Sequence, residues 1–148
     1  MRWVTLLITL MLTLCFVSPA WAVPKAPPIS DPGGVGILST RYLVDAVARL
    51  YNNYDGTVTL YGKSVANQTV DQIWVKVTLQ RWDGSKWVDV NTGYRLDKYN
   101  AHTVQISKDQ TIQRGNYYRC KGEHQVIHDG CYDPNPQVVQ YTDAMLID

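Results

Sequence analysis

Strict alternation of apolar and polar residues over residues 72–82 constrains the fold of this chain more than any other feature. Every second residue from Ile73 to Leu79 is apolar, and polar or aromatic residues fill the positions between them. Because successive side chains of a β-strand point to opposite faces, this pattern predicts a strand with one buried face. The turn-forming run Asp83–Lys86 follows, and the alternation resumes from Val88 to Leu96. The sequence therefore predicts a β-hairpin.

The register of this hairpin depends on the length of its loop. A two-residue loop at Asp83-Gly84 places Leu79 opposite Val88, whereas a four-residue loop pairs Trp82 with Trp87. Both registers keep the apolar residues on one face. A three-residue loop would not, because a slip of one residue turns every side chain to the other face. We therefore expect a loop of either two or four residues.

The acidic and aromatic residues also favour β structure over helix. Twelve of the 13 acidic residues are Asp, which suits turns, and Glu123 is the only Glu, a residue type that favours helices. All ten Tyr lie after residue 22, together with Trp74, Trp82 and Trp87. Tyr and Trp suit a half-buried pleated surface. The composition is therefore typical of an all-β domain.

Short alternating runs separated by turn signals extend from about residue 39 to the end of the chain. We expect a single domain, residues 39–148, that folds as an antiparallel two-sheet β-sandwich with an immunoglobulin-like or fibronectin-like topology. One run remains ambiguous, because the apolar spacing of residues 42–51 fits a helix as well as a first strand. The seven candidate strands are Tyr42–Tyr51, Thr57–Val65, Gln72–Trp82, Val88–Leu96, His102–Ser107, Asn116–Ile127 and Gln137–Ile147.

Residues 1–22 have the pattern of a secretory signal peptide. Arg2 precedes the uncharged apolar run Val4–Val17, and the small residues Ala20 and Ala22 follow. The run is shorter than the about 20 apolar residues that span a membrane, so we expect no membrane span in the mature protein. Cys15 has no small residue before it, which disfavours a lipid anchor. Residues 23–38 are rich in Pro and Gly and are expected to form an extended linker.

The mature chain is expected to carry no net charge. Arg2 is the only one of the 14 Lys and Arg residues inside the signal peptide, which leaves 13 basic residues against 13 acidic ones. Without a basic excess, nothing indicates nucleic acid or an anionic membrane as a partner. We expect a secreted, extracellular protein that either diffuses freely or associates with a cell wall.

Two segments carry more specific strand patterns. Val77–Val90 is similar to the hairpin pattern LQ-K/R-x-x-G-x-W, and Gly115–Val126 is similar to the strand pattern G-Y-x-Y-R-x-K-x-x-H. Both patterns resemble small secreted β-sandwich proteins of unknown function from Gram-positive, spore-forming bacteria, and the likeness covers roughly Arg41–Asp148. The resemblance implies a β-sandwich and favours a strand for Tyr42–Tyr51. It implies no activity and transfers no functional residue to this chain.

Four potential metal ligands lie within 12 residues: Cys120, His124, His128 and Cys131. Such a set resembles the donors of a tetrahedral zinc site. On an extended strand, however, residues 120 and 128 would lie about 26 Å apart, too far to share one ion. We therefore expect no metal at these residues and no cofactor.

Cys120 and Cys131 also form a candidate disulfide, because paired cysteines in a secreted chain usually bond. A tight turn at Asp129-Gly130 would place Cys131 opposite His128, eight strand residues from Cys120. A disulfide requires Cα atoms within about 7 Å of each other. The alternation favours the unbroken strand, whereas a break at Gly122 would allow the bond.

Trp74, Trp82 and Trp87 are the candidate binding residues. They lie on the face of the hairpin opposite the apolar set, so the three indoles are expected to be exposed or covered by a loop. Exposed Trp on a sheet is a common platform for sugar rings, and cross-strand stabilisation of the hairpin is the alternative role. The expected ligands are a cell-wall glycan or polysaccharide, or else another secreted protein.

The chain contains no recognised catalytic motif such as Gly-x-Ser-x-Gly or His-Glu-x-x-His. We therefore expect a secreted, non-catalytic module with a binding or structural role and no catalytic residue. A small secreted hydrolase is one alternative, using His124 with Cys120 or Cys131, or two Asp brought together by the fold. An inhibitor of another secreted protein is the other alternative.

Overall fold

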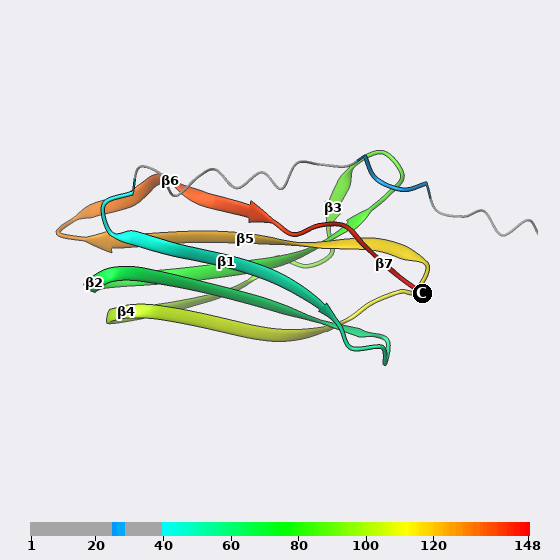
Figure 1. Ribbon diagram of the computed structural model, residues 1–148, viewed down its shortest axis with the longest axis horizontal. Helices are drawn as coiled ribbons and strands as arrows, with labels where there is room; N and C mark the ends of the chain where they lie inside the picture. The colour runs from blue at the N-terminus through cyan, green and yellow to red at the C-terminus, as the bar shows by residue number, and fades with distance from the viewer. Residues whose placement is uncertain (1–24, 29–39) are drawn as a thin grey trace, which may run out of the picture.

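The computed structural model describes residues 25–28 and 40–148, and the latter form seven antiparallel strands without a helix (Figure 1). Within these residues, no helix is therefore available that is long and apolar enough to cross a membrane. The expected all-β, antiparallel architecture is confirmed, whereas the signal peptide and most of the linker lie outside the described residues. The strands are β1 Leu43–Asn52, β2 Thr57–Trp82, β3 Trp87–Asp89, β4 Tyr94–Thr111, β5 Asn116–His128, β6 Cys131–Tyr141 and β7 Met145–Ile147.

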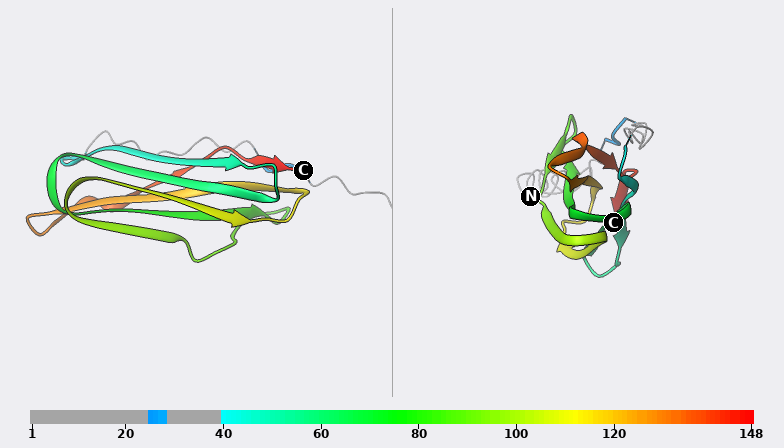
Figure 2. Two further views of the ribbon diagram at one scale, coloured as in Figure 1. Left: turned by 90° about the horizontal axis from the view of Figure 1, so that it is seen from below. Right: turned by 90° about the vertical axis from the view of Figure 1, so that its left-hand side faces the viewer.

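The longest strand, β2, doubles back on itself (Figure 2). The bend falls at the exposed residues Asn67–Thr69. The first arm buries alternate side chains, whereas the second arm buries side chains on both faces between Ile73 and Gln80. Ser64 Oγ on the first arm donates to the carbonyl oxygen of Trp74 on the second arm, at 3.0 Å. The sequence predicted two separate strands, 57–65 and 72–82, and these are the two arms of β2.

The other strands pair along these two arms. β1 pairs with the first arm of β2 and β5 pairs with the second, while β4 follows β2 along both arms. β6 and β7 pair with β5. The sheet has two halves, one built on each arm of β2. Because β2 and β4 run through both halves, the seven strands form one continuous, curled sheet. The finer expectation, two separate sheets with an immunoglobulin-like topology, is not confirmed.

Two glycines show how closely the two halves of the sheet approach each other. A Cβ atom on Gly62 would lie 2.6 Å from Val77 Cγ1, and one on Gly122 would lie 2.6 Å from Ala48 Cβ. Distances this short cannot be accommodated without movement of the facing strand. The first arm of β2 thus packs directly against the second arm, and β1 packs directly against β5.

β1 is a strand, as the resemblance favoured, although its apolar spacing also fitted a helix. The register shifts between Leu43 and Asp45, where the strand contains an irregularity. After that shift, Ala46, Ala48 and Leu50 alternate toward the core. A bulge adds one residue to the count, so the buried positions of a strand then imitate the spacing of a helix.

The hairpin between β2 and β3 has the four-residue loop and pairs Trp82 with Trp87. Asp83 Oδ1 stabilises the loop by accepting hydrogen bonds from the N–H groups of Ser85 and Lys86, each at 2.8 Å. The expected strand from 88 to 96 is interrupted after Asp89. Gly93, with φ of +85°, lies where a Cβ atom would collide with the side chain of Lys76, so the chain crosses the outer face of β2 here.

Candidate functional site

The indole rings of Trp82 and Trp87 lie side by side at the end of the β2–β3 hairpin. Their centroids are 5.5 Å apart and their planes are inclined by 59°, within the range of favourable aromatic pairs. Both residues are half-buried, so part of each ring is accessible. The pairing follows from the four-residue loop, which makes these two residues direct cross-strand neighbours.

Arg119 of β5 extends this pair into a larger surface. Its guanidinium carbon lies 4.4 Å from the centroid of Trp87 and 4.1 Å from that of Tyr141 on β6. Arg119 Nε donates to Gln80 Oε1 at 2.7 Å, which orients the guanidinium plane. Burial lowers the pKa of Arg119 from its ordinary value, although a guanidinium remains charged at neutral pH. We call Trp82, Trp87, Arg119 and Tyr141 the aromatic site.

The charge of Arg119 is not neutralised by an ion pair. No carboxylate in the described part of the chain lies within ion-pairing distance of its guanidinium. The nearest acid in its hydrogen-bond network is Asp89, which accepts from Gln80 at 2.7 Å rather than from Arg119 itself. The aromatic site therefore presents a cation held between two rings.

Trp74 does not belong to the aromatic site, although the sequence placed it on the same face. The residue is only 6% exposed, because the guanidinium of Arg95 covers its ring at 4.1 Å. Arg95 is held there by Asp97, at 2.7 Å. Of the three predicted Trp residues, the structure brings together Trp82 and Trp87 and leaves Trp74 buried elsewhere on β2.

Part of the linker lies beside the aromatic site. Lys25, Ala26 and Pro28 line a cleft of about 450 Å³ together with Trp82 and the hairpin loop. The indole nitrogen of Trp82 is buried and has no hydrogen-bond partner among the described residues. The linker thus flanks the aromatic site on its Trp82 side.

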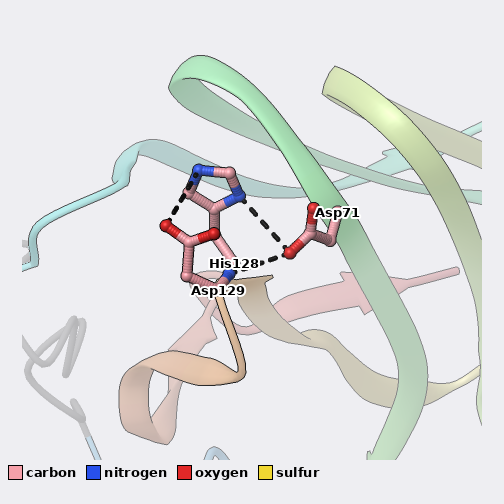
Figure 3. A group of neighbouring side chains, drawn as sticks. All are labelled: Asp71, His128 and Asp129. Carbon is pink, nitrogen blue, oxygen red and sulfur yellow. Dashed lines mark hydrogen bonds and ion pairs between the residues drawn. The ribbon is translucent and has the colours of Figure 1, made fainter.

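A second group of functional side chains lies at the bent end of the molecule (Figure 3). Asp71 of β2, His128 of β5 and Asp129 in the β5–β6 turn place one potential ligand atom each within 4.8 Å of one another. His128 Nδ1 lies 3.5 Å from Asp71 Oδ2, and His128 Nε2 lies 3.8 Å from Asp129 Oδ2. We call these residues the carboxylate–histidine cluster; only His128 among them was a sequence candidate.

The Cys and His residues considered for zinc do not converge in the structure. β5 is unbroken from Asn116 to His128, and Cys131 pairs with His128 across the turn at Asp129-Gly130. Cys120 is buried in the core, whereas Cys131 is exposed, and both are free thiols. Burial raises the pKa of the Cys120 thiol to about 12, so it is not a reactive thiolate at neutral pH.

His124 forms a buried pair with Ser64 that the sequence did not reveal. Ser64 Oγ and His124 Nδ1 are 2.9 Å apart, the distance of a nucleophile and its base, but both residues are fully buried. The Ser64 hydroxyl donates to the Trp74 carbonyl oxygen, which leaves His124 Nδ1 as the donor to Ser64. Burial lowers the pKa of His124 to about 4. The pair crosslinks facing strands and has no path for a substrate.

Comparisons with known proteins do not assign this chain to a family: no family model matches it, and no curated protein matches it significantly.

Proposed function

We propose that this protein is a secreted, non-catalytic β-sandwich module that binds an acidic glycan, such as a cell-wall polysaccharide, through the aromatic site. The observation that carries this proposal is the position of Arg119 between the rings of Trp87 and Tyr141. Aromatic rings offer faces on which sugar rings stack, and a guanidinium donates paired hydrogen bonds to carboxylates and phosphates. Both recognition elements are present within one continuous surface.

The geometry of Arg119 supports an anionic group on the ligand. Its Nε is engaged by Gln80, and its terminal nitrogens have no hydrogen-bond partner among the described residues. Stacking on two rings limits the rotamers of the side chain, so little conformational entropy is lost when it binds. An acidic sugar would supply a carboxylate in direct contact with the guanidinium, whereas the nearby Asp89 reaches Arg119 only through Gln80.

The placement of the potential catalytic groups supports a non-catalytic role. Ser64 and His124 are sealed in the core, and Glu123 is nearly buried between two lysines, with Lys121 Nζ at 3.5 Å. A cleft of about 440 Å³ lies beside β3, and its lining includes Arg81 and Tyr118 but neither His124 nor Glu123. Neither this cleft nor the one beside Trp82 has a His or Glu side chain in its lining.

The test is co-sedimentation of the purified protein with insoluble cell wall and with polysaccharides matched for charge. Polygalacturonate immobilised on beads and its fully methyl-esterified form are a suitable pair, because they differ only in the carboxylates. We expect Trp87→Ala to weaken binding at least tenfold and Arg119→Gln to remove the preference for the acidic form. Tyr99→Ala is the control, since Tyr99 is 67% exposed on β4, outside the aromatic site.

Each outcome has a defined meaning, provided that circular dichroism shows the variants to be folded. Equal binding of both polymers by the wild type would remove the anionic part of the proposal. Loss of binding in Tyr99→Ala to the same extent as in Trp87→Ala would show that the aromatic site is not the contact surface. Binding to none of the materials would overturn the glycan proposal.

One observation favours a second ligand class, a proline-rich peptide of another secreted protein. The chain's own segment Lys25–Pro28, with the sequence Lys-Ala-Pro-Pro, lies against Trp82. Proline-rich segments bind to grooves lined by aromatic residues because their extended conformation is already ordered. A synthetic peptide of residues 23–30 that competes with the acidic glycan would show that both ligands use the same surface.

A further inference from the structure

The carboxylate–histidine cluster joins two parts of the chain that are 58 residues apart in the sequence. Asp71 begins the second arm of β2, just after the bend, whereas His128 ends β5 and Asp129 starts the following turn. Asp129 and Gly130 have φ of +50° and +72°, as in the tight turn that reverses a two-residue hairpin. This turn brings the carboxylate of Asp129 back toward the imidazole of the preceding residue (Figure 3).

The surrounding residues hold the cluster in place. The N–H of Asp129 donates to Asp71 Oδ2 at 2.8 Å, which anchors that carboxylate. Tyr42 meets the imidazole of His128 edge to face, with centroids 5.0 Å apart. The amide nitrogen of Gln68 lies 2.9 Å from His128 Nε2 and donates to it, and a turn of that amide by 180° would present its oxygen as an acceptor instead. Metal-bound histidines typically donate the N–H of their second nitrogen to such a neighbouring acceptor.

The other nitrogen of His128 lacks a partner. Nδ1 is buried and makes no hydrogen bond, although Asp71 Oδ2 lies only 3.5 Å away. That separation exceeds the 2.7–3.2 Å of a normal N–H···O hydrogen bond. It agrees with the distance of about 3.3–3.5 Å between two ligands of one tetrahedral zinc ion, which follows from bond lengths of about 2.0–2.1 Å. The orphaned nitrogen and the carboxylate are thus spaced to share an ion.

The negative charge of the two carboxylates in the cluster also favours a bound cation. Among the described residues, no Lys or Arg forms an ion pair with Asp71 or Asp129, so the imidazole is their only neighbouring base. Their side chains are 58% and 79% exposed, which leaves the cluster open to ions from solution. Water can complete the coordination from this open side.

We propose that Asp71, His128 and Asp129 bind one divalent transition-metal ion, with zinc as the best match. An imidazole with two carboxylates suits zinc, whereas calcium takes six to eight oxygen ligands and has little use for nitrogen. The ion binds His128 Nδ1 and Asp71, whose Oδ2 already lies 3.5 Å from that nitrogen. The carboxylate of Asp129, which lies 3.8 Å from Nε2, turns toward the ion, and the amide of Gln68 turns so that its oxygen accepts from Nε2–H. The ion ties the second arm of β2 to the β5–β6 turn and thereby clamps the bent end of the sheet.

The experiment is a titration of chelator-treated, full-length secreted protein with zinc chloride, followed by calorimetry and by thermal unfolding. We expect one ion per chain and a rise of several degrees in Tm that EDTA reverses, because an ion that binds only the folded state stabilises it. Asp71→Asn, His128→Gln and Asp129→Asn should each weaken zinc binding at least tenfold. Calcium chloride at the same concentration should leave Tm unchanged.

Two control variants separate this site from other zinc donors. His102→Gln removes an exposed histidine on β4, and Cys131→Ser removes the exposed thiol opposite His128. Both should retain the stoichiometry and the rise in Tm. Absence of zinc binding would overturn the proposal, and so would binding that survives Asp71→Asn and Asp129→Asn but is lost in either control. Circular dichroism of each variant without metal shows whether its fold is intact.

Discussion

His124 and His128 lie four residues apart on the same strand, β5, yet their surroundings are opposite. His124 is fully buried, shares a hydrogen bond with Ser64 and has a pKa lowered to about 4 by burial. His128 lies at the end of the strand, between the carboxylates of Asp71 and Asp129. The two residues have the same side chain, so the difference in what each imidazole can bind comes from its position relative to the end of the curled sheet.

The difference shows how one strand serves two purposes. In the middle of β5, the facing strand β1 approaches so closely that only Gly122 fits beside His124. At the end of β5, the chain turns away and leaves room for charged side chains and solvent. We expect the middle of β5 to determine stability and the end of β5 to bind ligands. The following predictions test that division.

The largest effect is expected where β5 meets β1. Gly122→Val places a side chain where a Cβ atom alone would lie 2.6 Å from Ala48 Cβ, so the strands must separate. We expect a loss of about 3 kcal/mol or more in the free energy of unfolding, measured in urea. Gly130→Ala near His128 is the control, because its Cβ would meet nothing within 4 Å. It should cost only about 1 kcal/mol from its positive φ, and an equal loss in both variants would contradict the comparison.

His124 should make stability depend on pH. Its pKa is lower in the folded state than the ordinary 6.5, so the unfolded chain binds more protons between these values. The free energy of unfolding is therefore highest above pH 6.5. It decreases as the pH falls from 6.5 toward 4, by a total on the order of 3 kcal/mol. His124→Leu should flatten the curve over this window, as urea unfolding at several pH values would show. A curve as steep in the variant as in the wild type would exclude this explanation.

A smaller effect is expected for Asp133, a buried carboxylate near the bent end. It accepts hydrogen bonds from the N–H groups of Arg41, Tyr42 and Leu43 and so anchors the start of β1. Asp133→Asn replaces a charged acceptor and should cost about 2 kcal/mol. Urea unfolding of the variant and the wild type measures this difference in the free energy of unfolding. A cost near zero would show that water replaces these hydrogen bonds.

The smallest effect is expected for Asp71→Asn measured without metal. Asp71 is exposed, and an exposed ion pair contributes less than about 1 kcal/mol to stability. The variant should therefore unfold at nearly the same urea concentration as the wild type, while it loses the stabilisation by zinc. A decrease in the free energy of unfolding as large as that of Asp133→Asn would show that Asp71 stabilises the fold.

Much of the local structure could be predicted from the sequence. The strand at residues 72–82, the turn at Asp83 and the tight turn at Asp129-Gly130 depend on near neighbours, and the structure contains all three. The expectation of a single buried face was wrong, because Trp74, Thr78 and Gln80 on the opposite face are buried as well. The doubling of β2 could not be predicted, because the pattern breaks at Asn67–Thr69 in the way it would between two separate strands. In β1, the register shift between Leu43 and Asp45 interrupts the two-residue alternation, so the strand pattern could not be recognised there either.

The two candidate sites were accessible to sequence analysis only in part. Trp82 and Trp87 were found because they belong to one hairpin, whereas Arg119 and Tyr141 come from other strands. Neither residue was a candidate, because the sequence does not show which side chains of distant strands lie beside each other. Trp74 was grouped with Trp82 and Trp87 as exposed or covered by a loop, but Arg95 of strand β4 covers it instead.

The sequence by itself determined that the chain is all-β, where its principal hairpin turns and that the apolar residues from Ile73 to Leu79 face the core. Those properties depend on the two-residue period of a strand and on turn chemistry, both of which act between near neighbours. Only the tertiary structure decided that β2 and β4 bend to form one curled sheet, that Arg119 lies between two rings, and that Asp71 meets His128 and Asp129. These contacts depend on which distant strands pack together, and packing energies of the whole domain select that arrangement.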